Sequence, residues 1–306
     1  CCGKMRNRKG ICGNMCRGDF MKIKQAASYQ DQVRILKSKG LIIEDKNDCM
    51  QFLKHTNYYR FSAYCESFRY EGKGRFIEET TFDQIRNVYM FDQKLRAWLF
   101  EVVEEIEFAL RTQISYHHGT KYGPDGYLDP NNFSRYHDGR NFQHHLRTIL
   151  RENKDSPVVK HHNDKYDGKY PLWVIIEFFS MGMLSRFFKD MYNEDKNIIA
   201  NLYSTTGACL ENWIQCVTTI RNRCAHYSRF YDWEFADYPV FTEKALPREN
   251  TKVWGHLLVL RNMYPNEYEW NTELVPRLED IINRYKDDIK FEHLGLPQNW
   301  NEWLIK

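Results

Sequence analysis

Hydrophobic residues recur every three or four positions over long stretches of the chain, which is the pattern of amphipathic helices. The longest run begins at Thr81 and continues without Gly or Pro to Gly119, where we expect the helix to stop. A second run, from Leu210 to Arg229, also contains neither Pro nor Gly, and its apolar spacing predicts one helix with a buried face. The sequence therefore predicts an all-α protein organised around these two helices.

Shorter repeats predict further helices on both sides of these two. A helix is expected from Ser28 to Gly40, and a second one begins at a capping Asp48. Pro171 begins a buried helix that Ser180-Met181-Gly182 breaks. The remaining predicted helices are Met183–Tyr192, Ile198–Tyr203, Val253–Met263 and Leu274–Tyr285, and residues 76–81 are expected to form a loop or short hairpin.

These elements divide the chain into four segments. Residues 1–20, rich in Cys, Gly and basic side chains, are expected to be a disordered or artefactual tail. Residues 21–75 form an N-terminal helical module, and residues 76–235 form a helical core with a basic insertion at 134–170. Residues 236–306 are a C-terminal helical extension that packs on the core.

The charge is almost balanced outside the tail. Residues 1–20 hold five of the 44 basic and one of the 41 acidic residues, which leaves 39 basic and 40 acidic residues. A nucleic-acid contact must then come from a local patch. The insertion 134–170, with eight Lys or Arg against five Asp or Glu, is either such a patch or an ordinary solvated face. Within it, Arg147, Arg151 and Lys160 are the RNA-binding candidates.

Cysteine spacing and hydropathy bear on the compartment. Cysteines from Cys49 onward are scattered singly, which favours reduced thiols and a cytoplasmic protein over a disulfide framework. The longest apolar stretch, Pro171 to Phe188, contains Glu177 and Arg186, so we expect a core helix and no membrane contact. Adjacent histidines in the basic insertion suit a metal site poorly, and no metal or other cofactor is expected.

The candidate chemistry lies on the polar face of the helix predicted from Leu210 to Arg229. Asn222 and His226 fall opposite the buried stripe, and Arg221 lies on the flank. Imidazole moves protons near neutral pH, and guanidinium holds phosphate charge. RNA carries its own nucleophile, the 2′-hydroxyl, so these groups suffice for cleavage without a metal. The alternative is structural: Arg221 pairs with a helix carboxylate and His226 makes a core contact.

The segment Arg221 to Arg229, RNRCAHYSR, resembles the signature of bacterial abortive-infection proteins of the AbiD and AbiF type, a branch of the HEPN ribonuclease superfamily. The superfamily motif is Arg, a polar residue that is often Asn, three more residues and His. Ser228 stands where HepT-like toxins have Tyr, so a modified tyrosine is not carried over, and Asp232 stands where the family often has Asn. Further similar segments follow the family's order between residues 21 and 304: Asn57-Tyr58-Tyr59-Arg60, Phe91-Asp92-Gln93-Lys94-Leu95-Arg96, Arg111-Thr112-Gln113-Ile114, Tyr122-Gly123-Pro124, Pro171-Leu172-Trp173-Val174 and Leu294-Gly295-Leu296-Pro297.

This resemblance implies a HEPN-like helical bundle and a metal-independent endoribonuclease in phage defence. His226 would transfer the proton, Arg221 would clamp the transition state, and Asn222 would orient His226 or the phosphate. A small noncoding RNA is the implied inhibitor, as for a toxin held by its antitoxin. The alternative functions are a non-catalytic RNA-binding protein that holds a structured noncoding RNA, and a plain helical scaffold.

Three further polar residues are accessory candidates for the site. Arg111 and His118 resemble a second Arg and His pair, although Glu107 four residues before Arg111 also explains that arginine as a helix ion pair. Arg229 is a third accessory candidate, on the polar face with His226. The aromatic residues Tyr58, Tyr59 and Tyr64 either stack on bases or pack in the core.

The spacing between Arg221 and His226 also bears on whether the protein forms an oligomer. Arg221 and His226 are about 140° apart around a helix, so one helix aims them poorly at a single phosphate. A two-fold dimer would supply a second copy of both, and the resemblance implies the same arrangement. We therefore predict a homodimer whose interface is lined by Asn222, His226 and Arg229. If Arg111 and His118 complete the site instead, a monomer suffices.

Overall fold

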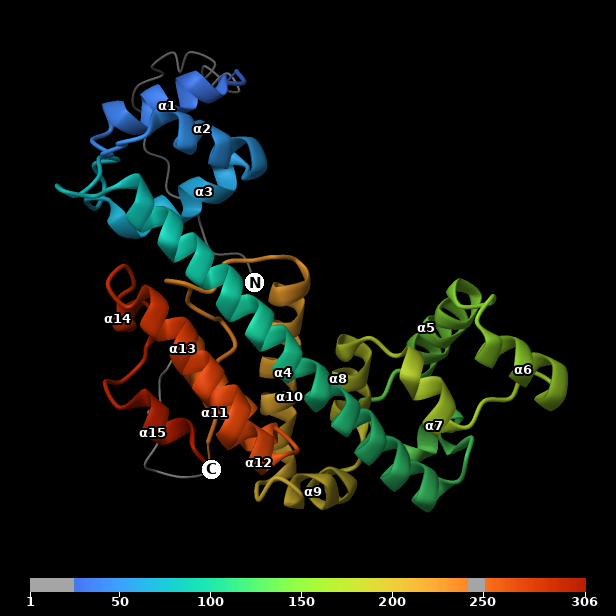
Figure 1. The fold of residues 1–306 in the computed structure, drawn as a ribbon. Coiled ribbons are helices and arrows are strands. Elements are labelled where there is room, and N and C mark those ends of the chain that lie inside the picture. The colour runs from blue at the N-terminus through green and yellow to red at the C-terminus, as the bar shows by residue number, and fades with distance from the viewer. Residues whose placement is uncertain (1–24, 242–250) are drawn as a thin grey trace, which may run out of the picture.

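A computed structural model describes residues 25–241 and 251–306, and the regular elements within these ranges are all helical (Figure 1). Extended pairing in the same ranges is limited to two isolated bridges, Ile42 with Thr81 and Arg69 with Phe76. The all-α prediction is confirmed. The expected tail at 1–20 lies outside the described residues. Within the described ranges, no helix is both long and apolar enough to cross a membrane.

The helices gather in groups along α4 (Phe82–Tyr122), which has 41 residues and crosses the molecule (Figure 1). At its beginning lie α1 (Tyr29–Ser38), α2 (Lys46–His55) and α3 (Tyr58–Cys65). Near its end lie α5 (Gly139–Glu152), α6 (Pro157–Tyr166) and α7 (Leu172–Ile175). The other helices are α8 (Met181–Asp190), α9 (Asn193–Asn201), α10 (Gly207–Ala225), α11 (Val253–Met263), α12 (Glu267–Glu269), α13 (Val275–Tyr285), α14 (Phe291–Leu294) and α15 (Trp300–Leu304).

The core is continuous from the first helix to the last, and α4 is its centre. Helices α3, α7, α9, α10 and α13 all pack against α4. Two buried indole groups attach the C-terminal elements: Trp98 Nε1 donates to the carbonyl of Leu274 at 3.0 Å, and Trp270 Nε1 donates to that of Leu304 at 2.6 Å. Because a buried indole N–H needs an acceptor, the Trp98 bond fixes Leu274 on α4, and the Trp270 bond holds α15 against the segment that precedes α13.

The prediction that α4 stops at Gly119 is wrong. The helix continues to Tyr122 and ends at Gly123, whose φ of 87° suits a glycine. Gly119 has a different role, because a Cβ there would lie 3.3 Å from Cε3 of Trp173. The glycine lets the Trp173 ring approach the α4 backbone, at a cost of about 1 kcal/mol in helix propensity.

Three other boundaries also differ from the predictions. The side chain of Asp45, rather than that of Asp48, caps α2. The helix after Pro171 is only one turn long and continues as a 3₁₀ turn over Ile176–Phe178. The predicted break at Ser180 is present, but the next helix, α8, begins at Met181 rather than at Met183, because the Ser180 hydroxyl accepts a hydrogen bond from the amide of Met183 at 3.2 Å and caps it.

Candidate functional site

Helix α10 presents the buried face that its sequence predicts. Trp213, Val217, Ile220 and Cys224 are all buried, and the helix packs on α4, α8, α9 and α11. Its first turn is capped by the Thr206 hydroxyl, which accepts from the Cys209 amide at 3.3 Å. The polar face therefore has a fixed direction relative to the core.

The prediction that this helix reaches Arg229 is wrong, because α10 ends at Ala225. His226 is its C-cap, and Tyr227 has a φ of 54° in the left-handed region. Three terminal carbonyls are satisfied locally: the amide of His226 donates to Asn222 at 3.0 Å, that of Tyr227 to Cys224 at 3.0 Å, and that of Ser228 to Arg223 at 2.8 Å.

The reason for this turn is a buried carboxylate on another helix. Asp92 of α4 is inaccessible to solvent, and its Oδ1 accepts from the amides of Phe230 at 2.9 Å and Tyr231 at 2.7 Å. Its Oδ2 accepts from the Tyr64 hydroxyl at 2.7 Å and from Arg96 at 2.6 Å. Burial, together with the charge of Asp92, raises the pKa of Tyr64. The carboxylate thus draws the chain out of the helix after Ala225.

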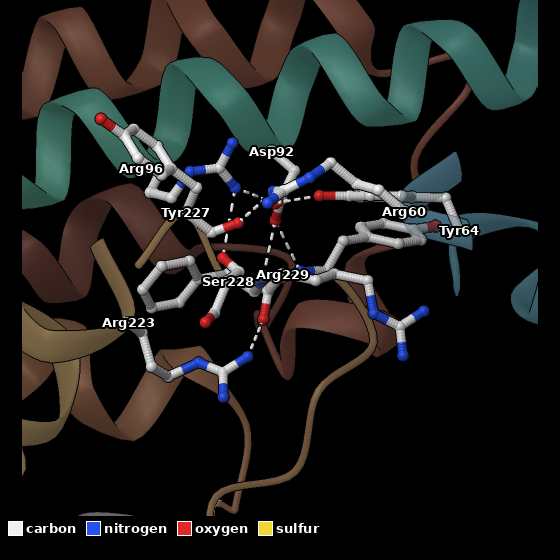
Figure 2. A network of polar contacts seen from close by, with 10 residues as sticks. Arg60, Tyr64, Asp92, Arg96, Arg223, Tyr227, Ser228 and Arg229 are labelled. Carbon is white, nitrogen blue, oxygen red and sulfur yellow. Dashed lines mark hydrogen bonds and ion pairs between the residues drawn. The ribbon is translucent and has the colours of Figure 1, made fainter. Parts of the chain in front are cut away.

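Arginines hold the carbonyl side of the same turn (Figure 2). We call Asp92, Arg60, Arg96 and Arg223 the Asp92 clamp. Burial lowers the pKa of Arg223 to about 10, so this guanidinium, which lies 4.0 Å from the Trp233 ring centroid, stays charged at neutral pH. Each arginine takes one of three consecutive carbonyls: Arg60 that of Tyr227 at 2.6 Å, Arg96 that of Ser228 at 3.2 Å, and Arg223 that of Arg229.

The polar residues of the motif from Arg221 to Arg229 therefore fall into two groups. Arg223 and Arg229 are used structurally, since Arg229 donates to the carbonyl of Ala63 and lies over the Tyr64 ring. Asn222 and His226 are exposed, and neither side chain has a hydrogen-bond partner within the described ranges. Arg221, with a side chain 35% exposed, is also accessible.

Arg221 points toward α4. Its Nε lies 3.8 Å from Oε2 of Glu107, whose Oε1 is paired with Arg111. Arg111 also donates to the carbonyl of Phe179 at 2.9 Å. The helix ion pair expected for Arg111 is thus present, while the Glu107 contact of Arg221 is long. A pocket of about 170 Å³ lies here, lined by Phe100, Val103, Glu104, Glu107, Phe108, Arg111 and Arg221.

The structure does not bring His118 to this pocket. Its ring is fully buried among those of Tyr122, Phe133 and Phe187, and neither ring nitrogen has a hydrogen-bond partner in the described part of the chain. Burial lowers the pKa of His118 to about 4, so the ring is neutral at neutral pH. Of the two accessory residues on α4, only Arg111 shares the pocket with Arg221.

The RNA-binding candidates lie in the group of helices at the end of α4. Arg147 and Arg151 are exposed on α5, and Lys160 is exposed on α6, 3.5 Å from Asp155.

The three tyrosines of the N-terminal module differ in exposure: Tyr64 is buried, Tyr58 is half-buried and Tyr59 is 84% exposed. Among the described residues, no cluster of three or more His, Cys, Asp or Glu could hold a metal ion.

The clamp could not be recognised as part of the site from the sequence alone. Arg60, Asp92 and Arg96 belong to segments noted for their resemblance, but no role followed from them. The available signal was the apolar surroundings of Asp92, since a carboxylate on the buried face of a long helix needs a partner. Its pairing with Arg96 at a spacing of four was readable, whereas its bonds to Phe230 and Tyr231 were not.

Comparison with known proteins bears on this arrangement. Neither the curated proteins nor the solved structures compared with the chain gave a match. A family model, described as Abi-like protein, matches residues 51–232. That span begins in α2, contains Arg60 and Arg96, and ends at the turn that the clamp holds. With more than half of its length matched, and with the helices that carry both the clamp and the Arg221 motif inside the matched span, the chain belongs to the Abi-like protein family.

Proposed function

We propose that this protein is a metal-independent endoribonuclease that acts in the cytoplasm in abortive infection. Membership of the Abi-like family points to abortive-infection phage defence. The ribonuclease activity is our inference from Arg221, Asn222 and His226 and from the resemblance of their spacing to the HEPN motif.

One observation carries the proposal. Within the nine residues from Arg221 to Arg229, two arginines are tied to backbone carbonyls. Among the residues that the structure describes, the exposed side chains of Asn222 and His226 have no partners, and Arg221 makes one long contact. Around these side chains the backbone is fixed by the Asp92 clamp. A binding or catalytic site requires polar side chains that are free to contact a ligand and a backbone that holds them in position. A merely solvated face does not need such a fixed backbone.

The chemistry follows from the groups available. The 2′-hydroxyl of the RNA would give its proton to a base and attack the adjacent phosphorus, the bond from phosphorus to the 5′-oxygen would break, and that leaving oxygen would take a proton from an acid. His226 transfers a proton in this reaction, Arg221 binds the charge that develops on the phosphoryl oxygens, and Asn222 orients His226 or the phosphate. The products are a 2′,3′-cyclic phosphate and a 5′-hydroxyl. Burial raises the pKa of the neighbouring Cys224 thiol to about 12, which makes it a poor nucleophile.

The complete site would need two chains. Arg221 is directed to Glu107 on α4, whereas His226 caps the end of α10, and one copy supplies a single imidazole. We propose a homodimer in which the α10 ends of both chains meet and a second His226 acts on the other side of the phosphorus. Phe100 and Phe108, both 45% exposed beside Arg221, offer apolar surface for such a contact.

A second function, RNA binding without cleavage, is favoured by the basic side chains on α5. Arg147 and Arg151 are exposed, and neither forms an ion pair within the described ranges. Such arginines are suited to a phosphate backbone. A small noncoding RNA that inhibits the protein could bind there while substrate is cut at His226, so the two functions are compatible.

The deciding experiment is cleavage of cellular RNA by purified protein in EDTA, with His226→Ala and Arg221→Ala as test variants. We expect the wild type to leave 2′,3′-cyclic phosphate ends and His226→Ala to lose about 10²- to 10⁴-fold in rate. His55→Ala, which alters an exposed histidine on α2, is the matched control and should cleave normally. Cleavage by His226→Ala at the wild-type rate, or cleavage that stops in EDTA, would refute the proposed mechanism.

A further inference from the structure

A second candidate site lies at the end of α4 that is remote from the α10 motif. A pocket of about 480 Å³ opens between α6 and α7, and its volume falls within the range of about 300–1,000 Å³ that is usual for ligand sites. Two large aromatic side chains line it while remaining exposed, Trp173 at 52% and Tyr166 at 45%. Asp125, Lys169 and Tyr170 also line it.

The exposure of Trp173 is built into the fold. The ring lies against Gly119, where any larger residue would place a Cβ 3.3 Å from Cε3. One side of the indole is therefore fixed on α4, and the accessible part lines the pocket. A rigid tryptophan with an open face is a stacking platform, and the core does not need it there.

The polar groups around the pocket fit a nucleobase and its phosphate. Lys169 is exposed and forms no ion pair within the described part of the chain, and Asp125 offers a carboxylate to an exocyclic amino group. A neighbouring pocket of about 390 Å³ shares Asp125, Lys169 and Tyr170 and adds Arg147. Lys169 lines both pockets and Arg147 lines the neighbouring one, so both cations lie on the side where the two pockets adjoin, and the phosphates of a strand that leaves a stacked base on that side would pass them.

We propose that this pocket binds an unstacked nucleobase of single-stranded RNA, with the base on Trp173 and Tyr166 and the flanking phosphates on Lys169 and Arg147. The choice of RNA rests on the proposed function. Glu107, beside Arg221, and Gly119, beside Trp173, are about 18 Å apart along α4. The pocket therefore binds RNA at a distance from the scissile phosphate and selects a single strand over a duplex, whose bases are not available for stacking.

The test uses the full chain carrying His226→Ala, so that RNA is not consumed, and a fluorescein-labelled single-stranded RNA of about 12 nucleotides. Binding is measured by fluorescence anisotropy, alongside a duplex of the same sequence. We expect the single strand to bind more tightly. Trp173→Ala and Tyr166→Ala should each weaken binding about 5- to 150-fold, whereas Trp173→Phe, which keeps an aromatic face, should retain most of it. Tyr268→Ala, at an exposed aromatic on α12, is the matched control and should bind as the parent does.

Because Trp173 touches α4, each variant is first compared with its parent by circular dichroism and thermal melting. A folded Tyr166→Ala protein that binds RNA as tightly as the parent overturns the proposal, and so does equal affinity for the duplex. Binding of a proline-rich peptide, with no binding of single-stranded RNA, would also overturn it. None of these readouts depends on cleavage, so a failed ribonuclease assay leaves this result interpretable.

Discussion

Asp92 and Arg96, one turn apart on α4, are bonded to each other at 2.6 Å and hold opposite backbone groups of the same distant turn. The carboxylate accepts the amides of Phe230 and Tyr231, and the guanidinium donates to the carbonyl of Ser228. Both side chains are buried, so neither exchanges these bonds for water. The pair links the N-terminal half of α4 to the turn that follows α10 and begins at His226.

The first prediction concerns the stability of this link. Asp92→Asn should lower the free energy of unfolding by about 3–5 kcal/mol, because it leaves Arg96 buried without a counter-charge. The measurement is urea denaturation followed by circular dichroism. Glu101→Gln, which removes the exposed pair with Arg277 on the same helix, is the control and should cost about 1 kcal/mol or less. Equal losses for the two variants would contradict the role given to Asp92.

A second prediction separates positioning from folding. Arg60 is exposed but donates to the carbonyl of Tyr227, next to His226, at 2.6 Å. Arg60→Ala should lower kcat for RNA cleavage by about 10²-fold through misplacement of the turn, while the melting temperature changes little. Arg60→Lys, which keeps a donor, should recover part of the rate. A loss of rate that follows melting temperature across the variants would show a purely structural role.

The third prediction addresses the basic residues of α5 and α6. Replacing Arg147, Arg151 and Lys160 together by Ala should weaken RNA binding and reduce the slope of log affinity against log salt by roughly 0.7 to 0.9 for each lost phosphate contact. A control with the same change in charge replaces Arg34, Lys46 and Lys54 of the N-terminal helices. If binding curves at several salt concentrations overlay those of the wild type, these residues are only a solvated face.

Assembly is the subject of the fourth prediction. Light scattering during size exclusion should give the mass of a dimer, and Phe100→Glu should shift the protein to monomer because it places a charge on apolar surface beside Arg221. Tyr268→Glu, at an exposed aromatic of α12, should remain dimeric. A wild-type monomer that is fully active at nanomolar concentration refutes the shared site and would return attention to Arg111 of the same chain.

The fifth prediction is a pH dependence that arises from His118. Its pKa is lowered to about 4 in the folded protein against about 6.5 when unfolded, so the unfolded chain binds more protons between these values. Stability should fall as the pH drops from 6.5 to 4, by about 3 kcal/mol from this residue. His118→Leu should remove that part of the loss, as measured by urea denaturation at each pH. It should also keep RNA cleavage, because the ring does not reach the Arg221 pocket.

The local sequence pattern was sufficient to predict those features whose deciding interactions lie within a few residues of one another. The all-α class, the buried stripe of Trp213, Val217, Ile220 and Cys224, and the Glu107 to Arg111 ion pair follow from helical periodicity and from a spacing of four. The motif from Arg221 to Arg229 could also be recognised from the sequence, because its residues are consecutive.

Tertiary structure decided what depends on distant partners. Helix α10 ends at Ala225 because amides at 230 and 231 bind a carboxylate 138 and 139 residues earlier in the chain, and no local signal at Arg229 records that competition. Gly119 lies inside α4 and not at its end, and its missing Cβ leaves room for the ring of Trp173, 54 residues later in the chain. His118 is enclosed by rings from other segments, which makes it part of the core. In each case the contact is made with a residue far away in sequence. The free energy of such contacts exceeds the small differences in local helix propensity.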